Sequence, residues 1–384
     1  ALTSLLCAAA PNLNVLVAAR VLQGITAALL IPTSLALVQV EFHGDDRGRA
    51  VGLWSGLSGI TTLAGPLLGG WLADDVSWRA IFVLNVPLAV AAVWLARAAV
   101  PSRPGGGRRG PVDSQGTVMA VGMFGGSVFA LTQGPEWGWT HPAVLAAGAL
   151  TAVAGLGFLD AERNHPAPML PPRYLRQRPF VGANLVTLGV YFALSGLLFL
   201  LAIQLQRVAG YTAFQAGAAT APITLLLLLL SPSAGRLAGR RGPEPFLVAG
   251  PFVAAVGALL LGTVGPQADY LSDVLPGVVI FGVGLSLTVA PVTSAALNAL
   301  DETRAGVASG VNNAVARTAQ LLAVPLLPLV AGISGIDRVA GTAFDQGFHS
   351  ACRWAAGALV ATALVSAGVL GIRPGAAGFD AAGS

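Results

Sequence analysis

The sequence is dominated by apolar runs of about 20 residues, the length that an α-helix needs to cross a bilayer. Short stretches carrying Arg, Asp, Glu, Gly and Pro separate these runs. The runs are rich in Leu, Ala, Val and Gly and show no alternating pattern, so they do not resemble the strands of a transmembrane barrel. Because backbone polar groups in lipid must be paired within the segment, we expect the runs to be helices.

The composition agrees with lipid as the surrounding solvent. Hydrophobic residues make up 55% of the chain and charged residues only 10%, with a mean hydropathy of +0.74. Soluble globular domains carry roughly 25% charged residues. So few charges cannot cover a water-facing surface, and the sequence therefore predicts an all-α polytopic membrane protein.

We expect a dozen helices in the chain. The first is a partial helix over residues 1–10, which is too short to span and follows no initiating Met, so we expect that the natural N-terminus is missing. The other helices are expected near residues 14–40, 50–72, 79–98, 117–133, 142–159, 180–203, 213–234, 246–265, 274–299, 306–333 and 351–372.

The basic residues give the orientation of these helices. All 21 of them are Arg, 15 of which fall in one set of alternate loops and 4 in the other, with Arg20 and Arg317 inside spans. The positive-inside rule assigns the Arg-rich set, and with it the C-terminal tail, to the cytoplasm. The abundance of Ala, Gly and Arg is typical of a GC-rich bacterial genome, so we expect the bacterial inner membrane.

Two similar segments indicate an internal repeat. Residues 46–52 resemble residues 302–308, and each follows a helix with a central proline, Pro32 or Pro291. Both copies start from the same side of the membrane, which predicts two pseudo-symmetric bundles related by an axis along the membrane normal. Two such bundles can rock about a central site, as a transporter requires.

Arg20 is the first candidate for a functional residue. A charged side chain at the centre of a membrane helix costs about 2.5–3.5 kcal/mol on insertion scales unless it meets water or a partner. Gln23 lies one turn away and can share its hydrogen bonds. A structural Arg bonded to carbonyls of a neighbouring helix is the alternative, and we favour a role of Arg20 and Gln23 in the transport path.

Other polar residues inside the predicted spans are weaker candidates. Asn313 and Arg317 form a polar stripe that fits a structural role as well as a role in the transport path. Asn184, Tyr191 and Gln204 are candidates for a substrate cavity, although Gln204 lies near a predicted span end and is also compatible with an interfacial position.

Acidic residues, histidines and cysteines show no catalytic or metal-binding pattern in the sequence. All 17 acidic residues are expected in loops or at span ends, so none is placed deep in the membrane to carry a proton. Cys7 and Cys352 are far apart and the four His are scattered. We expect no enzyme, no metal and no cofactor, and the loop Arg residues explain the basic pI without nucleic acid.

Several motifs together resemble the major facilitator superfamily, and more narrowly its fourteen-span drug:proton antiporter family. Arg20-x-x-Gln23-Gly24 followed by Pro32 is similar to the fourth-helix motif of the family. Residues 65–70, Gly-Pro-Leu-Leu-Gly-Gly, are similar to its antiporter motif, and residues 78–87 to the opening of its sixth helix. Residues 235–242 resemble the C-terminal copy of its cytoplasmic loop motif, with Gly239 where the family has Asp.

The resemblance implies a domain arrangement with 12 of 14 spans present. Residue 1 then falls in the third helix of the family, and the helices near 117–133 and 142–159 are an inserted pair. The implied parts are an N-terminal bundle over 1–98, linkers and inserted helices over 99–179, a C-terminal bundle over 180–373 and a tail over 374–384.

The resemblance also implies residue roles. Proton coupling would pass to Arg20. In the helix that carries the antiporter motif, tight helix packing is expected at Gly56, Gly59, Gly65, Pro66, Gly69 and Gly70. Those of the cytoplasmic loop motif are Gly235, Arg236, Arg240 and Arg241.

We therefore expect a proton-driven exporter of amphipathic, cationic or antibiotic-like compounds. Its partners would be the small-molecule substrate, protons and the lipid bilayer, and we expect a monomer with no cofactor. One alternative is a proton symporter for a small nutrient on the same fold. A non-transporting membrane scaffold or sensor is the second alternative, but the longest loop is only about 20 residues, too short for an appended domain.

Overall fold

The computed structural model describes residues 1–41, 65, 68–99, 113–165, 174, 176–300, 305–333 and 341–370. In the helix that begins at Leu13, the side chains are described as far as Ala27. Within these ranges the chain is helical and has no strand. Its contacts divide it into two compact units, one formed by residues 1–110 and 210–228 and the other by residues 111–209 and 229–384.

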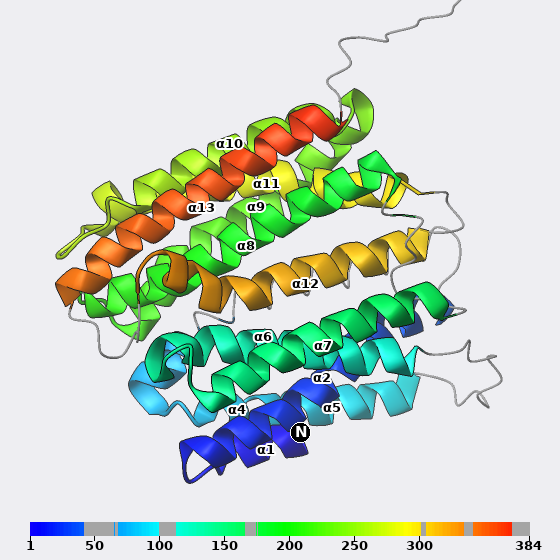
Figure 1. Ribbon diagram of the computed structural model, residues 1–384. Helices are drawn as coiled ribbons and strands as arrows, with labels where there is room; N and C mark the ends of the chain where they lie inside the picture. The colour runs from blue at the N-terminus through cyan, green and yellow to red at the C-terminus, as the bar shows by residue number, and fades with distance from the viewer. Residues whose placement is uncertain are drawn as a thin grey trace, which may run out of the picture. The chain divides into compact units, whose positions relative to one another are not determined.

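The first unit contains the N-terminal helices (Figure 1). Their bounds are α1 Leu2–Ala8, α2 Leu13–Glu41, the short π-helix η1 Leu72–Val76, α4 Ala80–Val83 and α5 Asn85–Ala99, and the first part of α9 Ala213–Arg241 belongs with them. Helix α1 packs against α2, α4 and α5. Helix α1 is therefore in contact with two longer helices, α2 and α5, and with the short α4.

The second unit is centred on one long helix, α8 Arg178–Arg207 (Figure 1). Around it lie α10 Glu244–Leu261, α11 Leu275–Asn298, α12 Ala305–Val330 and α13 Gly341–Leu370, each in contact with α8, and η3 Tyr270–Val274 precedes α11. A further pair, α6 Ser114–Trp137 and α7 Pro142–Asn164, packs side by side, and α6 contacts α12.

Helix ends follow ordinary capping chemistry. The carboxylate of Asp113 accepts a hydrogen bond from the Gly116 N–H at the start of α6. Helix α6 ends at Trp137 and is followed by Gly138, whose φ of +90° is readily adopted only by glycine. Pro142 then begins α7 at a position where its missing N–H has no intrahelical partner to lose.

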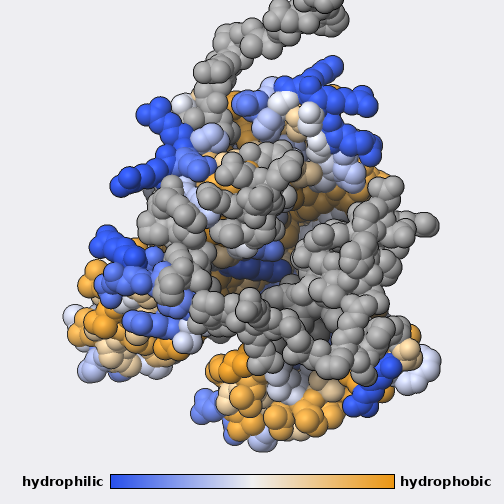
Figure 2. Space-filling view, turned by 90° about the vertical axis from the view of Figure 1, so that its right-hand side faces the viewer, coloured by the Kyte–Doolittle hydropathy of each residue, from blue (hydrophilic) through white to orange (hydrophobic). Residues whose placement is uncertain are grey.

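The described part of the chain contains nine helices long and apolar enough to cross a membrane. Their outward faces carry large apolar side chains, for example Trp94, Val153 and Leu229, each 68% exposed. Figure 2 looks onto the ends of the helices, where hydrophilic residues gather beside apolar flanks. Lipid-facing sides and polar ends together confirm the polytopic all-α class.

Most predicted helices agree with the structure, but α13 and α9 are longer than expected. Helix α13 begins at Gly341 and not near residue 351. Phe344, Phe348 and Cys352 recur every four residues and form a buried stripe, so the helical face extends toward the N-terminus although polar residues lie between them in the sequence. Helix α9 continues past 234 to Arg241, so residues 235–241 are helical and not a loop. Of the helix predicted at 50–72, the structure describes only residues 65 and 68–72.

Glycines allow α10 and α11 to touch through their backbones. A Cβ placed on Gly257 would overlap the backbone of Phe281, and one on Gly284 would overlap the backbone of Ala254. Lipid-embedded helices gain little from burying apolar side chains, so close approach at small residues supplies much of their attraction.

We predict that Gly284→Ala lowers the free energy of unfolding by about 1–3 kcal/mol, since the added methyl group can be accommodated only by moving the two helices apart. Gly357→Ala in α13 is the matched control, because a Cβ there meets no atom within 4 Å. The control should be neutral or slightly stabilising. Thermal unfolding in detergent measures both variants, and equal stabilities would contradict the packing argument.

The first unit has a capping contact between distant parts of the sequence. The Asp74 carboxylate accepts hydrogen bonds from the backbone N–H groups of Phe214 (2.7 Å) and Ala213 (3.3 Å) at the start of α9. Gly70 lies beside the same turn, where a Cβ would come within 2.7 Å of Ala213 O. The Phe214 hydrogen bond, against a smaller opposing effect of desolvation, holds the pKa of the Asp74 carboxyl below its usual value.

The Asp74 cap predicts an acid-sensitive contribution to stability. Because the folded-state pKa is lowered, the contribution is present above the unfolded-state pKa of about 3.9 and is lost as the pH falls through the folded value. Asp74→Asn should therefore reduce the melting temperature at pH 6 and flatten its decline between pH 5 and pH 3. A variant that declines as steeply as the unaltered protein would rule out this source of acid sensitivity.

Candidate functional site

The first unit contains an open cavity of about 1110 Å³ lined by α1, α2 and α5, in which the Arg20 side chain is exposed. Much of its wall is aliphatic, with Leu16, Val17 and Leu88 among the contributors. Its polar lining consists of Thr3, Ser4, Arg20, Gln23, Thr26 and Asn85. The cavity therefore combines a mainly apolar wall with one charged side chain.

Arg20 and Gln23 form a hydrogen-bonded chain in this cavity. Arg20 Nη1 donates to Gln23 Oε1 at 2.8 Å, and Gln23 Nε2 donates to Ser4 Oγ on α1 at 2.8 Å. The hydrogen bond that we expected between Arg20 and Gln23 is thus present. A guanidinium carries five N–H donors, and this bond uses one of them. The Arg20 guanidinium also lies 5.6 Å from the centre of the Phe82 ring, within the range of a cation–π contact.

Arg79 shows how a structural arginine behaves in the same unit. Its Nη2 donates to the backbone carbonyl of Ala10 at 3.0 Å, and its guanidinium stacks 4.3 Å from the Trp78 ring. Arg79 therefore ties the connection between α1 and α2 to the start of α4. Arg20 bonds a side chain and lines a cavity, which is a different environment.

The second unit contains a buried polar cluster between α8 and α12. Asn312 Nδ2 donates to Thr187 Oγ1 at 2.7 Å and to Asn184 Oδ1 at 3.3 Å. The Asn184 amide in turn donates to the carbonyl of Phe180 at 2.8 Å. All three polar side chains are buried, so the cluster fixes the contact between the two helices.

Two predicted candidates on α12 point away from this cluster. Asn313 and Arg317 are exposed, and Arg317 Nη1 donates to Gln320 Oε1 at 3.3 Å. Asn312 therefore makes the helix contact, and its neighbour Asn313 does not. Tyr191 on α8 is half-buried.

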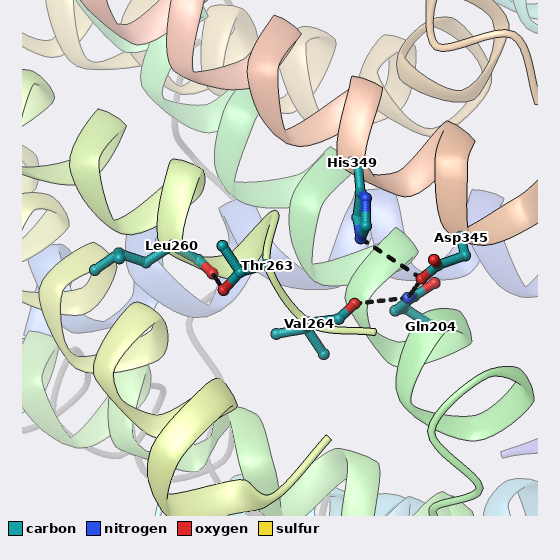
Figure 3. A network of polar contacts seen from close by, with 6 residues as sticks. All are labelled: Gln204, Leu260, Thr263, Val264, Asp345 and His349. Atoms are coloured by element: carbon teal, nitrogen blue, oxygen red, sulfur yellow. Dashed lines mark hydrogen bonds and ion pairs between the residues drawn. The ribbon is translucent and has the colours of Figure 1, made fainter. Parts of the chain in front are cut away.

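Gln204 lies in a buried helix junction. It is fully buried at the end of α8, where Nε2 donates to the carbonyl of Val264 and to the carboxylate of Asp345 on α13. Figure 3 shows these partners converging on the amide from two sides. Neither Asp345 nor its neighbour His349 was expected to lie within a helix.

The motif glycines and arginines differ in their surroundings. A Cβ on Gly65 or Gly69 would meet no atom within 4 Å, in contrast to the close approach at Gly70. Gly56, Gly59 and Pro66 lie outside the described residues. In α9, a Cβ on Gly235 would lie 3.2 Å from the Ala290 side chain.

The arginines that follow Gly235 are solvated. Arg236, Arg240 and Arg241 are exposed, and Arg236 donates to Ser233 Oγ at 2.9 Å. Arg240 and Arg241 occupy the last turn of α9, where positive charge interacts favourably with the helix dipole.

Among the described residues, no three His, Cys, Asp or Glu side chains form a group that could hold a metal ion.

Comparison with known proteins identifies relatives over most of the chain. The Major Facilitator Superfamily profile matches residues 1–324. The multidrug resistance protein Stp of Mycobacterium tuberculosis is 33% identical over 314 residues, which cover 82% of this chain and 58% of that protein. The chain therefore spans little more than half the length of Stp.

One further relative and one solved structure also match most of the chain. The methylenomycin A resistance protein of Bacillus subtilis is 31% identical over 337 residues, covering 87% of this chain and 71% of that protein. A solved structure from work on substrate recognition in proton dependent oligopeptide transporters also matches. Its TM-score is 0.61, and the match covers 96% of this chain and 81% of that chain. At 15% identity, that likeness shows the fold alone.

The α8–α12 cluster predicts a difference between two adjacent asparagines. Asn312→Ala should lower the free energy of unfolding by about 0.5–1.5 kcal/mol, because it removes two buried hydrogen bonds and leaves Thr187 without its donor. Asn313→Ala, one residue further on an exposed face, should change it by less than about 0.5 kcal/mol. Unfolding of both variants in mixed detergent micelles compares them directly, and equal losses would contradict the assignment.

Proposed function

Because the chain belongs to the major facilitator superfamily, we propose that it is a proton-coupled exporter of amphipathic drugs or antibiotics that works by alternating access. The relatives named for resistance to antibiotics and multiple drugs support this direction and class of substrate. The proposal concerns the whole protein, and the chain spans little more than half the length of its relative Stp.

The observation that carries the proposal is the Arg20–Gln23–Ser4 chain in a mainly apolar cavity. Apolar walls bind hydrophobic bodies with little discrimination between similar shapes, which suits a broad set of amphipathic substrates. A permanent positive charge in such surroundings favours the deprotonated form of any acid brought close to it. Arg20 can therefore make the release of a proton depend on what occupies the cavity.

The remaining roles follow from this proposal. Asn313 and Arg317 are exposed polar residues of α12 that would lie on the transport path. The proton gradient is the energy source, so no cofactor is required. We place the protein as a monomer in the inner membrane of a bacterium, with its C-terminus in the cytoplasm.

Proton movement in inverted membrane vesicles tests the proposal. Vesicles carrying the protein are given an acidic interior, and lipophilic cations and antibiotics are added one at a time while a pH-sensitive dye is followed. An exporter should exchange the added compound for internal protons, so the gradient should collapse with a substrate. Arg20→Ala should slow this collapse at least about tenfold, the loss expected when a charged group essential to one step is removed.

Three controls separate the possible outcomes. Arg163→Ala removes an exposed arginine at the end of α7 and should leave the exchange intact. Gln23→Leu should weaken the exchange, since it removes the acceptor that orients Arg20. Exchange that persists in Arg20→Ala would overturn the role of Arg20. No exchange with any compound, in vesicles shown to contain the protein, would favour symport of a nutrient instead.

A further inference from the structure

The second unit has a pocket of its own, with a volume of about 230 Å³, lined by α6, α8 and α12. Most of its wall is apolar and includes Phe199 of α8 together with Pro325 and Pro328 of α12. Two polar residues of α6, Thr132 and Glu136, also line it. None of the described residues around the pocket is basic, so the Glu136 carboxylate gives it a single negative charge.

The two polar side chains of α6 lie one helical turn apart and are available to a ligand. Glu136 and Thr132 are both exposed, and neither side chain makes a hydrogen bond or ion pair with a described residue. Thr151 on the neighbouring α7 differs, because its hydroxyl donates back to the Ala147 carbonyl at 2.8 Å. The pocket therefore presents a free carboxylate and a free hydroxyl on one face of α6.

Helix α12 adds a third polar group to the pocket. Pro328 has no N–H, so the carbonyl of Val324, four residues earlier, lacks its usual helical donor. Val324 is exposed and itself lines the pocket. A carboxylate, a hydroxyl and a backbone carbonyl thus border one small apolar space, and each of them can accept a hydrogen bond.

The pocket lies where α6 reaches the membrane–water interface. Glu136 is one residue before the end of this helix, and Trp137 and Trp139 beside it are exposed, as is typical of aromatic residues at the level of the lipid headgroups. Further along α6, Val121 and Phe129 are exposed on the apolar side of the helix. A ligand bound here can therefore keep a charged end at the interface and an apolar body in the bilayer.

Charge, hydrogen bonding and size together define the class of ligand. One negative charge and three acceptors suit a group that is positively charged and carries three N–H donors, as a primary ammonium does. The aromatic ring of Phe199 adds a surface of the kind that attracts cations. Pockets for drug-sized ligands have roughly 300–1,000 Å³, so this smaller one admits the charged end of a ligand and leaves the rest outside.

We infer that this pocket binds the primary ammonium end of an amphipathic amine, whose apolar body stays in the lipid beside α6 and α12. Glu136 supplies the opposite charge, and the Thr132 hydroxyl and the Val324 carbonyl accept the remaining N–H groups. A free amphipathic amine and the headgroup of phosphatidylethanolamine share this chemistry. Binding at this site requires neither a proton gradient nor the cavity of the first unit, so the inference does not rest on export.

Equilibrium binding of decylammonium tests the site. The protein is placed in phosphatidylcholine nanodiscs, and the bound amine is corrected for its partition into empty nanodiscs. Glu136→Gln keeps the size of the side chain and removes its charge, so it should weaken binding about tenfold, the loss expected for a hydrogen bond to a charged group. Asp160→Asn removes an exposed carboxylate from α7 and should leave binding unchanged. Equal affinity in the unaltered protein and in Glu136→Gln would overturn the proposal.

Two further comparisons distinguish a pocket from a negatively charged surface. Thr132→Trp leaves Glu136 in place and fills the space beside it, so it should weaken binding as well. Decyltrimethylammonium has the same charge but no N–H donor, and should bind more weakly than decylammonium. Undiminished binding in Thr132→Trp, or equal binding of the two cations, would contradict the assignment. Melting temperatures measured without amine show whether each variant is folded.

Nanodiscs that contain phosphatidylethanolamine distinguish the two sources of the ammonium group. If the lipid headgroup occupies the site, decylammonium should lose apparent affinity for the unaltered protein in these nanodiscs. If its affinity stays the same, the ligand is a free amine. The vesicle experiment can fail while these measurements succeed, and the reverse also holds, so the two proposals are tested separately.

Discussion

Helices in a bilayer gain little free energy by exchanging lipid for each other's apolar side chains, so their association depends on close packing and on polar contacts. Both are visible in this protein. Gly257 and Gly284 bring the backbones of α10 and α11 together, and an alanine-rich stripe on α12 lies buried. At three helix junctions a side-chain amide makes the polar contact, namely Gln23 to Ser4, Asn312 to Thr187 and Gln204 to Asp345. An amide suits these positions because it donates and accepts without carrying a charge.

Much of the fold could be predicted from the sequence because each helix that crosses a membrane needs about 20 predominantly apolar residues in succession. Length and apolarity alone located most helices within a few residues, as for α7 and α8. The pairing of Arg20 with Gln23 was also predictable, since residues three apart on a helix are neighbours and an unpartnered charge is costly. Local spacing was sufficient for these features because the interacting groups lie on one helix.

Contacts between helices could not be predicted in the same way. Asp345 and His349 were predicted to lie in a loop and not in a helix. The residue that donates a hydrogen bond to the Asp345 carboxylate within the helix junction is Gln204, which lies 141 positions away in the chain, so the sequence around Asp345 gives no sign of it. Asn313 was favoured over Asn312 because neither residue alone shows which side of the helix is covered. The buried residues Ala308, Ala316, Ala319 and Ala323 share a face with Asn312 at spacings of three and four. That stripe of small residues could have indicated that Asn312, and not Asn313, lies on the covered face of the helix.

The two cysteines of the chain are buried at positions where thiol alkylation can report on helix packing. Cys7 is fully buried on α1, with its Sγ 3.8 Å from Gln23 Oε1 in the Arg20 network. Cys352 is fully buried on α13, three residues after His349. Since thiols react only when a reagent can reach them, each is a native probe for one of the two units. Alkylation of Cys7 reports loosening of α1 from α2, and alkylation of Cys352 reports opening of the packing around α13, without any engineered residue.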